Sequence, residues 1–563
     1  MRKIGKIIKI TLLTLVGLPL AMIVISLIIG VYLYCKADAL EPQADIDLDK
    51  YALSIDKDSL KVCGDNHLLM NRYGLWEAHI AGNPLERGTI YGKLSKELLK
   101  YQEDVFVEQI HEIVPSDLWV EFLHKLIVIF NGDMARHIPL EYREEIYAMS
   151  LSCTDEYNSY GSPYGRQLNY HAAHDIGHAM QEYMLVGCSS FACWDSDSED
   201  GNLIVGRNFD FYVGDKFAKN KIILFVEPTQ GYRFASVSWA GMMGVLSGMN
   251  EKGLTVTINA AKGAIPTSSA MPISLLAREI LQYASNIEEA YNIAKQHKTF
   301  VSESLLIGSA IDGKAAIIEK TPEKIALFES DKDRILCTNH YQSEAFSSDE
   351  HNRENIATSD SPYRYERLNE LINAHSPLNA NDAANILRNR YGKGNADIGL
   401  SNEKALNQFI AHHSVVFQPD ELRFWVSTSP WQLGEYVCYD LDSIFNAGQH
   451  IAGTKVIEVA NIEADSSALE NEYIAVCRYR EQYREITAAI KEKRELSQEF
   501  IGNFIENNPN YFQVYNVLGD YEFSRNNHDK AMKYWGKAIS LEIPRMNERE
   551  EILKKIKQYD KGH

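Results

Sequence analysis

The feature that most limits the fold of this chain is a change in residue pattern close to residue 188. From about Leu68 to Leu185 the pattern is mainly helical, because the apolar residues in Gly92–Val107 and Leu118–Phe130 recur at intervals of three and four. Beyond residue 188 the pattern becomes a series of short β-prone runs separated by Gly, Asn or Asp turns. These runs are Ser189–Trp194, Leu203–Phe211, Lys221–Val226, Phe234–Trp239, Gly244–Met249 and Leu254–Asn259.

Helical and β-prone segments alternate in blocks after this first set of strands. Helices are expected at Pro272–Tyr283 and Ile287–Lys295, and a helix-rich stretch over 361–413. Blocks of strands and helices indicate α+β layers rather than alternating βαβ units. The further expected strands are Ser304–Ile311, Ala315–Lys320, Ile325–Glu329 and Leu422–Ser427, and Asn250-Glu251-Lys252-Gly253 is expected to form a hairpin turn.

The N-terminus carries an uncharged run from Ile10 to Tyr34, preceded by basic residues between Arg2 and Lys9. Its 25 residues, at 1.5 Å each, could cross a hydrocarbon core about 30 Å thick. The basic flank predicts a cytoplasmic N-terminus and a single-pass membrane protein whose remainder is extracytoplasmic, either periplasmic or extracellular. The alternative is a cleaved signal or a lipoprotein at Cys35, although no clear cleavage site precedes that cysteine.

The C-terminal hundred residues are helical and charged in pattern. Leu518, Gly519, Ala531, Trp535 and Ala538 follow one another at offsets that match a tetratricopeptide repeat. One repeat cannot bury its own apolar face, so the preceding helical sequence is expected to stack on it. An isolated helical hairpin that caps the catalytic domain is the alternative, and a protein partner could bind these helices.

Charge and cysteine content exclude several classes of protein. The formal net charge is −20, and no basic stripe is present to replace phosphate counterions, which argues against nucleic-acid binding. The eight cysteines contain no C-x-x-C pair, which excludes a zinc ribbon. They are Cys35, Cys63, Cys153, Cys188, Cys193, Cys337, Cys438 and Cys477.

The segment Gly187-Cys188-Ser189 enters the first expected strand and is followed by Arg207 and Asp210 on the next strand. Antiparallel pairing could bring both charged residues beside Cys188. An arginine there would favour the thiolate and lower the pKa of the thiol, and a carboxylate would hold a cationic amine. Without that pairing, Cys188 is an inert buried cysteine and the Arg-Asp pair merely flanks a turn.

Four blocks in order resemble the linear-amide hydrolases of the N-terminal-nucleophile superfamily. The first is Cys188 followed by Gly206-Arg207-Asn208-Phe209-Asp210, and the second is the hairpin at Gly248–Leu254 followed by Asn259. The third is Thr338-Asn339-His340-Tyr341 and the fourth Ser361-Pro362-Tyr363-Arg364. Within this superfamily the chain looks most similar to the acyl-coenzyme A:6-aminopenicillanic acid acyltransferase branch, which is related to choloylglycine hydrolase and acid ceramidase.

The resemblance implies a four-layer αββα sandwich and a precursor that cleaves itself between Gly187 and Cys188. The freed α-amine, with a reference pKa of about 7.7–8.0, would act as base for the Cys188 thiol. Asp210 would orient this amine, and Arg207 and Arg364 would polarise the site. Asn259 and Asn339 would donate to the oxyanion. The substrate would be a small-molecule amide, and no cofactor is implied.

These observations divide the chain into four parts. They are a membrane anchor over 1–35, a tether with a mainly helical segment over 36–187, a catalytic domain over 188–450 and a helical appendage over 451–563. An extracytoplasmic enzyme tethered to a bilayer has no access to cytoplasmic acyl-coenzyme A, so hydrolysis of an apolar N-acyl amide is favoured over transfer.

Two other functions compete with this interpretation. His171, His174 and His178 recur at helical spacing with Asp175, and such a face could bind a metal, although no H-E-x-x-H motif is present. The third possibility is a membrane-tethered binding or scaffold protein on a degenerate hydrolase fold. All the candidate site residues are present, which argues against a degenerate, inactive hydrolase fold. No metal site is predicted.

Overall fold

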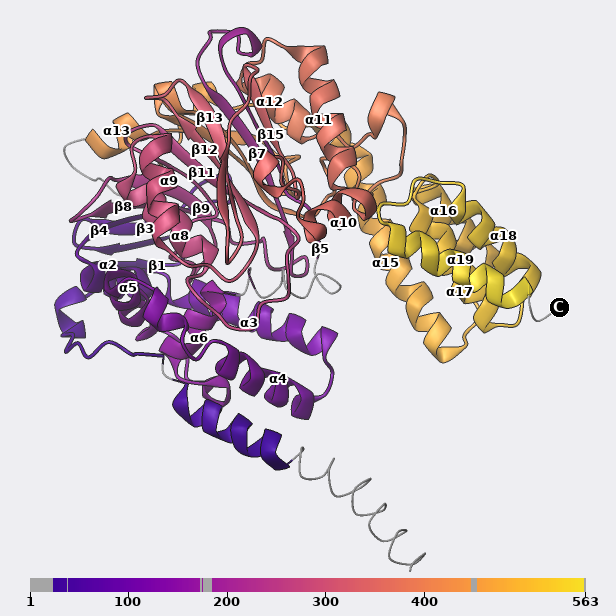
Figure 1. Cartoon of the computed structure of the whole chain (residues 1–563), viewed down its shortest axis with the longest axis horizontal. Helices are drawn as coiled ribbons and strands as arrows, with labels where there is room; N and C mark the ends of the chain where they lie inside the picture. Colours follow the sequence, from indigo (N-terminus) through magenta and orange to yellow (C-terminus); the bar gives the residue numbers. More distant parts are fainter. Residues whose placement is uncertain (1–23, 38, 173–174, 176–184, 447–452, 561–563) are drawn as a thin grey trace, which may run out of the picture.

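Two stacked β-sheets form the centre of the molecule, and helices cover both outer faces (Figure 1). The computed structural model describes the chain except residues 1–23, 38, 173–174, 176–184, 447–452 and 561–563. Separate apolar clusters fill the space between the sheets and the space under each helical layer. This arrangement confirms the predicted α+β fold class and its αββα layers.

The larger sheet has 11 strands among the described residues, in the order β1-β2-β3-β4-β8-β9-β10-β11-β12-β13-β14. Neighbouring strands are antiparallel except for β4 and β8, which are parallel. The strands are β1 (Ile55–Lys57), β2 (Leu60–Cys63), β3 (Asn66–Met70), β4 (Trp76–Gly82), β8 (Ile222–Pro228), β9 (Phe234–Ser238), β10 (Ser247–Asn250), β11 (Leu254–Ala260), β12 (Glu303–Ser309), β13 (Lys314–Lys320) and β14 (Ile325–Phe328).

Strands β1–β4 differ from the mainly helical segment predicted over 36–187. They extend the larger sheet beyond β8, with Trp76 opposite Ile222 in the parallel register. The sandwich therefore includes residues that precede Cys188. The sequence pattern missed these strands because they are short and contain buried polar residues such as His67 and Glu77, which break the alternation of apolar and polar positions.

The smaller sheet carries the candidate nucleophile at one of its inner strands. Its order is β15-β6-β7-β16-β17-β18, and β5 also pairs with β7. The strands are β5 (Leu185–Val186), β6 (Ser189–Cys193), β7 (Ile204–Tyr212), β15 (Arg334–Cys337), β16 (Ala411–Gln418), β17 (Arg423–Ser427) and β18 (Tyr436–Asp440).

Two groups of helices enclose the sheets. Helices before Cys188, together with α8 and α9, pack on the larger sheet, and α11 and α12 pack on the smaller one. The helices of the sandwich are α2 (Pro84–Leu94), α3 (Lys96–Ile113), α4 (Asp117–Phe130), α5 (Leu140–Ser150), α6 (Pro163–His171), α8 (Ile273–Tyr283), α9 (Ile287–Gln296), α10 (Glu350–Thr358), α11 (Ser361–His375), α12 (Ala380–Leu387) and α13 (Leu441–Asn446).

The predicted hairpin turn after β10 is confirmed and joins the larger sheet to its helical cover. The Oδ1 atom of Asn250 accepts the backbone N–H groups of Lys252 and Leu254, and Gly253 has a φ of +70°, which favours glycine. The Nδ2 group of Asn250 donates to the carbonyls of Leu281 and Ala284, at the C-terminal end of α8. One buried side chain thus closes the turn and satisfies a helix end.

The C-terminal helices form a separate apolar cluster to one side of the sandwich (Figure 1). A Cβ atom on Gly519 would lie 2.3 Å from the Trp535 ring, so this glycine permits the close contact between α17 and α18. The predicted helical appendage is confirmed, whereas its tetratricopeptide character and a protein partner remain predictions. Its helices are α14 (Ser466–Glu470), α15 (Glu472–Glu492), α16 (Gln498–Asn507), α17 (Phe512–Ser524), α18 (His528–Ile539) and α19 (Met546–Asp560).

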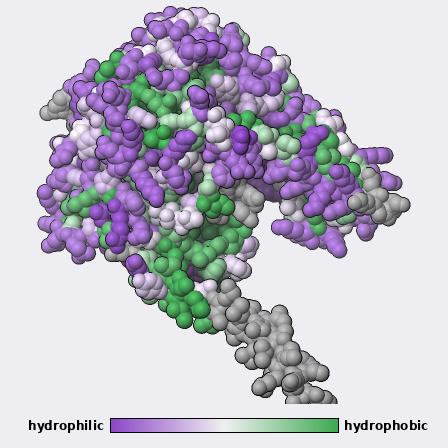
Figure 2. Space-filling view, in the orientation of Figure 1, coloured by the Kyte–Doolittle hydropathy of each residue, from purple (hydrophilic) through white to green (hydrophobic). Residues whose placement is uncertain are grey.

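The predicted single-pass membrane location is contradicted. Among the described residues, no helix combines the length and the apolar content that crossing a bilayer requires. The described part of the predicted anchor is a helix over 24–36. Residues 1–23 of the predicted anchor lie outside the described part of the chain. Apolar surface gathers over α4 beside this helix, where Leu118, Trp119 and Phe122 are exposed (Figure 2).

Candidate active site

Cys188 is buried at the junction of two strands that pair with the same neighbour. Val186 of β5 lies opposite Phe211 of β7, and Ser189 of β6 lies opposite Asn208 of the same strand. The Gly187–Cys188 peptide bond therefore lies between β5 and β6, beside the C-terminal half of β7. The strand pairing that the sequence motif required is present.

Arg207 links Cys188 to the facing sheet. Its Nη2 atom lies 3.8 Å from the Sγ atom of Cys188, and the side chain is fully buried. The guanidinium also donates to the carbonyl oxygens of Leu246 and Ile258, which face each other across the open end of the β10–β11 hairpin. A fixed positive charge is thus held against the thiol by backbone carbonyls of the larger sheet.

The thiol of Cys188 is not activated in this uncleaved chain. Burial raises its pKa above the usual value, and the nearby Arg207 opposes this shift without reversing it. Arg207 acts to lower the pKa of the thiol, as expected, but burial outweighs it in the uncleaved chain. The same burial lowers the pKa of the Arg207 guanidinium.

Arg364 approaches Cys188 from the opposite side, near the start of α11. Its Nη1 atom donates to the carbonyl oxygen of Cys188 at 2.7 Å and to the hydroxyl of Ser189 at 2.9 Å. Its other two nitrogens bind the side chains of Asn339 and Asp360. The guanidinium therefore joins the nucleophile strand, the loop after β15 and α11 at one point.

Asp210 lies on β7 beside the Gly187–Cys188 bond. Its backbone carbonyl accepts the N–H of Gly187 at 3.2 Å. Its buried carboxyl oxygens have no hydrogen-bond partner among the described residues. Burial raises the pKa of this carboxyl to about 7, although Arg364 and Arg207 act to lower it. A buried carboxyl of this kind is suited to receive a cationic amine.

In the uncleaved chain, the side chains of the two predicted oxyanion asparagines donate hydrogen bonds to backbone carbonyls around the site. The Nδ2 group of Asn259 donates to the carbonyls of Cys337 and Thr338, at 3.0 and 3.4 Å, and its Oδ1 atom accepts from Ser190. The Nδ2 group of Asn339 donates to the carbonyl of Ala260 at 2.8 Å. Asn259 is linked to the strand after Cys188 through Ser190, and Asn339 is linked to Cys188 through Arg364. The oxyanion role of both asparagines remains a prediction.

Sequence reasoning missed a buried polar chain behind Arg207. The Arg207 guanidinium contacts the hydroxyl of Ser247, which lies 2.8 Å from Nε2 of His413, and the ring of His413 contacts His412 at 2.9 Å. Burial lowers the pKa of His412 to about 3 and that of His413 well below its usual value, so both rings are neutral. The adjacent histidines at the start of β16 were the available signal.

Gln408 is a second residue that sequence reasoning missed. Its Nε2 atom donates to the carbonyl oxygen of Gly187 at 3.1 Å, which is the carbonyl that self-cleavage would attack. Gln408 also lines a cleft of about 500 Å³ together with Tyr212, Tyr479 and Arg480. The cleft thus lies between the C-terminal end of β7, the strand that carries Asp210, and the C-terminal appendage.

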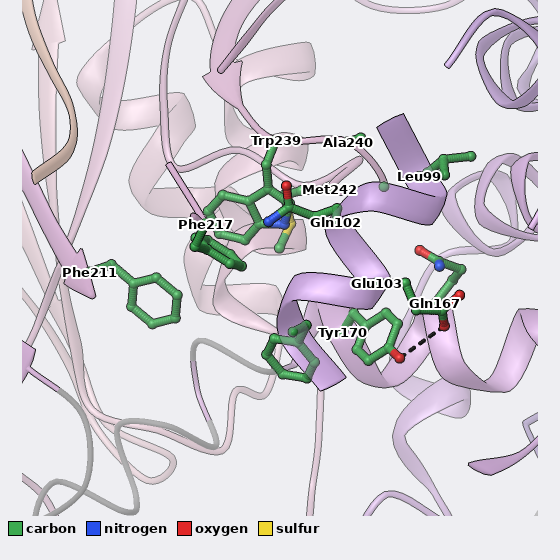
Figure 3. A pocket seen from close by; sticks show the side chains of 12 residues that line it. Leu99, Gln102, Glu103, Gln167, Tyr170, Phe211, Phe217, Trp239, Ala240 and Met242 are labelled. Atoms are coloured by element: carbon green, nitrogen blue, oxygen red, sulfur yellow. Dashed lines mark hydrogen bonds between the residues drawn. The ribbon is translucent and has the colours of Figure 1, made fainter. Parts of the chain in front are cut away.

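A smaller cavity, of about 30 Å³, lies between the preceding helices and the end of β7. Figure 3 shows Phe211, Phe217 and Trp239 on one side and Tyr170 and Glu103 on the other. Tyr170 donates to the Glu103 carboxylate at 2.9 Å. This volume is enough for only a few water molecules and is too small for an amide substrate.

No group of three or more metal-ligating side chains occurs among the described residues, which include one histidine, His171, of the face considered as an alternative metal site. The Nδ1 atom of His171 contacts the carbonyl of Gln167 at 2.8 Å, and its Nε2 atom accepts the N–H of Met243 at 2.9 Å. Both ring nitrogens therefore have protein partners. His174 and His178 lie outside the described part of the chain.

Comparison with known proteins supports the resemblance in the catalytic region. Residues 196–428 match the family model of acyl-coenzyme A:6-aminopenicillanic acid acyl-transferase. The matched range includes Arg207, Asp210, Asn259, Asn339 and Arg364, and it begins after Cys188. This match supports the N-terminal-nucleophile superfamily and the branch that the sequence motifs resemble.

Individual relatives are distant. An uncharacterized protein of Archaeoglobus fulgidus is 26% identical over 338 residues, which cover 53% of this chain and 55% of that protein. The chain spans about half the length of the curated relatives it matches. Two similar solved structures are a Caenorhabditis elegans ortholog of N-acylethanolamine-hydrolyzing acid amidase (15% identity, TM-score 0.31, 41% of this chain and 93% of that one) and a variant of the conjugated bile acid hydrolase of Clostridium perfringens (14%, 0.32, 48% and 95%).

Proposed function

We propose that the chain is an enzyme that cleaves itself between Gly187 and Cys188 and then acts on a linear amide through the Cys188 thiol. The observation that carries this proposal is the position of Cys188 between two buried guanidinium groups. Arg207 lies against its sulfur and Arg364 against its carbonyl oxygen. The match to an acyltransferase family over the residues that follow supports amide chemistry.

Self-cleavage would begin with attack of the Cys188 sulfur on the carbonyl carbon of Gly187. The carbon–nitrogen bond breaks, a carbon–sulfur bond forms, and the nitrogen of Cys188 takes up a proton to become a free α-amine. Water then hydrolyses the thioester, which leaves a carboxylate on Gly187 and restores the thiol. The Asp210 carboxyl, beside this bond and with its pKa raised to about 7, is suited to exchange protons there.

The mature site would have a different balance of charge from the uncleaved chain. A free amine beside the sulfur supplies the base that the buried thiol lacks before cleavage. Its protonated form would pair with Asp210. The sulfur then attacks the carbonyl of the substrate amide, the amine product leaves with a proton, and water or an amine acceptor resolves the thioester.

The choice between hydrolysis and transfer is open in this proposal. The argument for hydrolysis rested on an extracytoplasmic, membrane-tethered location, and it falls with that location. The preference for apolar substrates that partition into a membrane rested on the same location and falls with it. A scaffold function on a degenerate fold is disfavoured because the buried charges of Arg207, Asp210 and Arg364 are costly to keep without a chemical role.

A panel of N-acyl amides tests the proposal directly. The wild-type chain is expected to release amine from at least one member, and Cys188→Ala to release none. Cys193→Ala is the matched control because Cys193 is equally buried, at the far end of the strand that follows Cys188. Turnover that survives in Cys188→Ala would exclude Cys188 as the nucleophile.

A further inference from the structure

We infer that Gln408 is the catalytic residue that stabilises the oxyanion during self-cleavage at Gly187. This inference rests on the proposed function, since it concerns the same bond. The side chain of Gln408 is buried, and its Nε2 group donates to the Gly187 carbonyl oxygen at 3.1 Å. When sulfur attacks this carbonyl, the displaced electron pair moves onto the oxygen that Gln408 already contacts.

Asn259 and Asn339 are already committed to other carbonyls in the uncleaved chain. The amide group of Asn259 donates to Cys337 and Thr338, and that of Asn339 donates to Ala260. Arg364 donates to the carbonyl oxygen of Cys188, on the other side of the bond that breaks. Gln408 is therefore the side chain whose donor is aligned with the oxygen that becomes negative.

The backbone around Gln408 is held in an unusual conformation that fixes this side chain. The next residue, Phe409, has a φ of +56°, which is rare for a bulky side chain. The N–H of Phe409 donates to Oδ1 of Asn407 at 3.0 Å, and its carbonyl accepts from Arg480 of α15 at 2.7 Å. Groups on both sides of the turn thus stabilise a conformation that positions Gln408.

The glycine before Cys188 has a steric explanation in this arrangement. A Cβ atom at position 187 would lie 2.6 Å from Nε2 of Gln408 and 3.0 Å from its Oε1 atom. Any other residue would push the amide away from the carbonyl. The Gly187 position is therefore matched to the Gln408 amide, and the two residues should depend on each other.

Gln408 also lines the cleft of about 500 Å³ beside the appendage. This volume can hold water, which the second step of self-cleavage consumes. The carbonyl carbon of the Gly187 thioester would then lie next to a source of water once the peptide bond has broken.

The rate of self-cleavage in the full chain tests this inference. Chains synthesised in vitro are sampled over time, and the uncleaved fraction is measured by intact mass. Gln408→Ala is expected to slow cleavage by about a hundredfold to a thousandfold, the usual effect of losing an oxyanion donor. Gln408→Glu, which keeps the shape but not the amide donor, should be similarly slow. Gln432→Ala, which removes another fully buried glutamine of the same domain, should cleave at the wild-type rate.

A double-substitution cycle tests the steric match. Gly187→Ala should slow cleavage because its Cβ displaces the Gln408 amide. The Gly187→Ala/Gln408→Ala chain should be no slower than Gln408→Ala alone, since the amide is already absent. Wild-type cleavage in both Gln408→Ala and Gln408→Glu, or fully additive losses in the cycle, would overturn the inference while leaving the proposed function intact. A wild-type chain that never cleaves would overturn both.

Discussion

The guanidinium of Arg364 donates to the carbonyl oxygen of Cys188 at 2.7 Å, although 176 residues separate them in the sequence. The same side chain also binds Ser189, Asn339 and Asp360. Four groups from three segments of the chain therefore accept hydrogen bonds from the one planar guanidinium of Arg364. This contact fixes the backbone of the proposed nucleophile relative to α11.

Arg364→Lys is predicted to fold but to lose about a hundredfold in amide turnover, because a single ammonium group cannot reproduce the fork. Arg367→Lys is the control. Arg367 is also buried, lies one turn further along α11 and contacts Asn389 rather than Cys188. Turnover and thermal unfolding are measured for both variants. Equal turnover in the two would show that Arg364 has only a structural role.

The buried carboxyl of Asp210 should make the uncleaved chain less stable as pH rises. The unfolded carboxyl loses its proton near the reference pKa of 3.8, whereas the folded carboxyl keeps its proton up to a pKa of about 7. Between these values the folded state binds more protons, so this stabilising contribution is complete below pH 4 and is lost as pH rises to about 7. The loss corresponds to about 4 kcal/mol.

Urea unfolding at pH 4, 6 and 8 measures this effect in the uncleaved Cys188→Ala chain. Adding Asp210→Asn should remove the corresponding part of the pH dependence and leave that of the other buried acids. If both chains lose the same free energy of unfolding between pH 4 and 8, the Asp210 carboxyl is not the group that titrates.

Arg480 is predicted to connect the C-terminal appendage to self-cleavage. It donates to the Phe409 carbonyl and holds the turn that carries Gln408. Arg480→Ala should slow cleavage by about tenfold, equivalent to roughly 1.4 kcal/mol of barrier. Arg484→Ala is the control, because Arg484 is one turn further along α15 and its side chain is 71% exposed. Equal cleavage rates in the two variants would show that the contact made by Arg480 of the appendage has no effect on self-cleavage.

Much of the sandwich could be predicted from the sequence because β6–β11 and β12–β14 form two runs of strands, and clear turns separate the strands within each run. The strands that were missed lack such a signal. Arg334–Cys337 is only four residues long, and Ala411–Gln418 begins with two histidines inside a stretch that seemed helical. Their assignment depends on pairing with β6 and β7, which a local pattern does not contain.

The residues of the candidate site were likewise predicted only in part from the sequence. Motif blocks identified Cys188, Arg207 and Arg364, which converge in the fold. Two properties depended on tertiary structure instead. Burial outweighs Arg207 in setting the pKa of the thiol, and Gln408 reaches Gly187 across 221 residues from a segment without a motif.

The most direct test of the central claim is the intact mass of the purified wild-type chain beside Cys188→Ala. Cleavage between Gly187 and Cys188 predicts two species of about 21 and about 43 kDa, in proportion to their share of the 63.9 kDa chain. The larger species should begin at Cys188, and Cys188→Ala should remain one intact chain. A wild-type chain that turns over amides while it remains uncleaved would contradict the account.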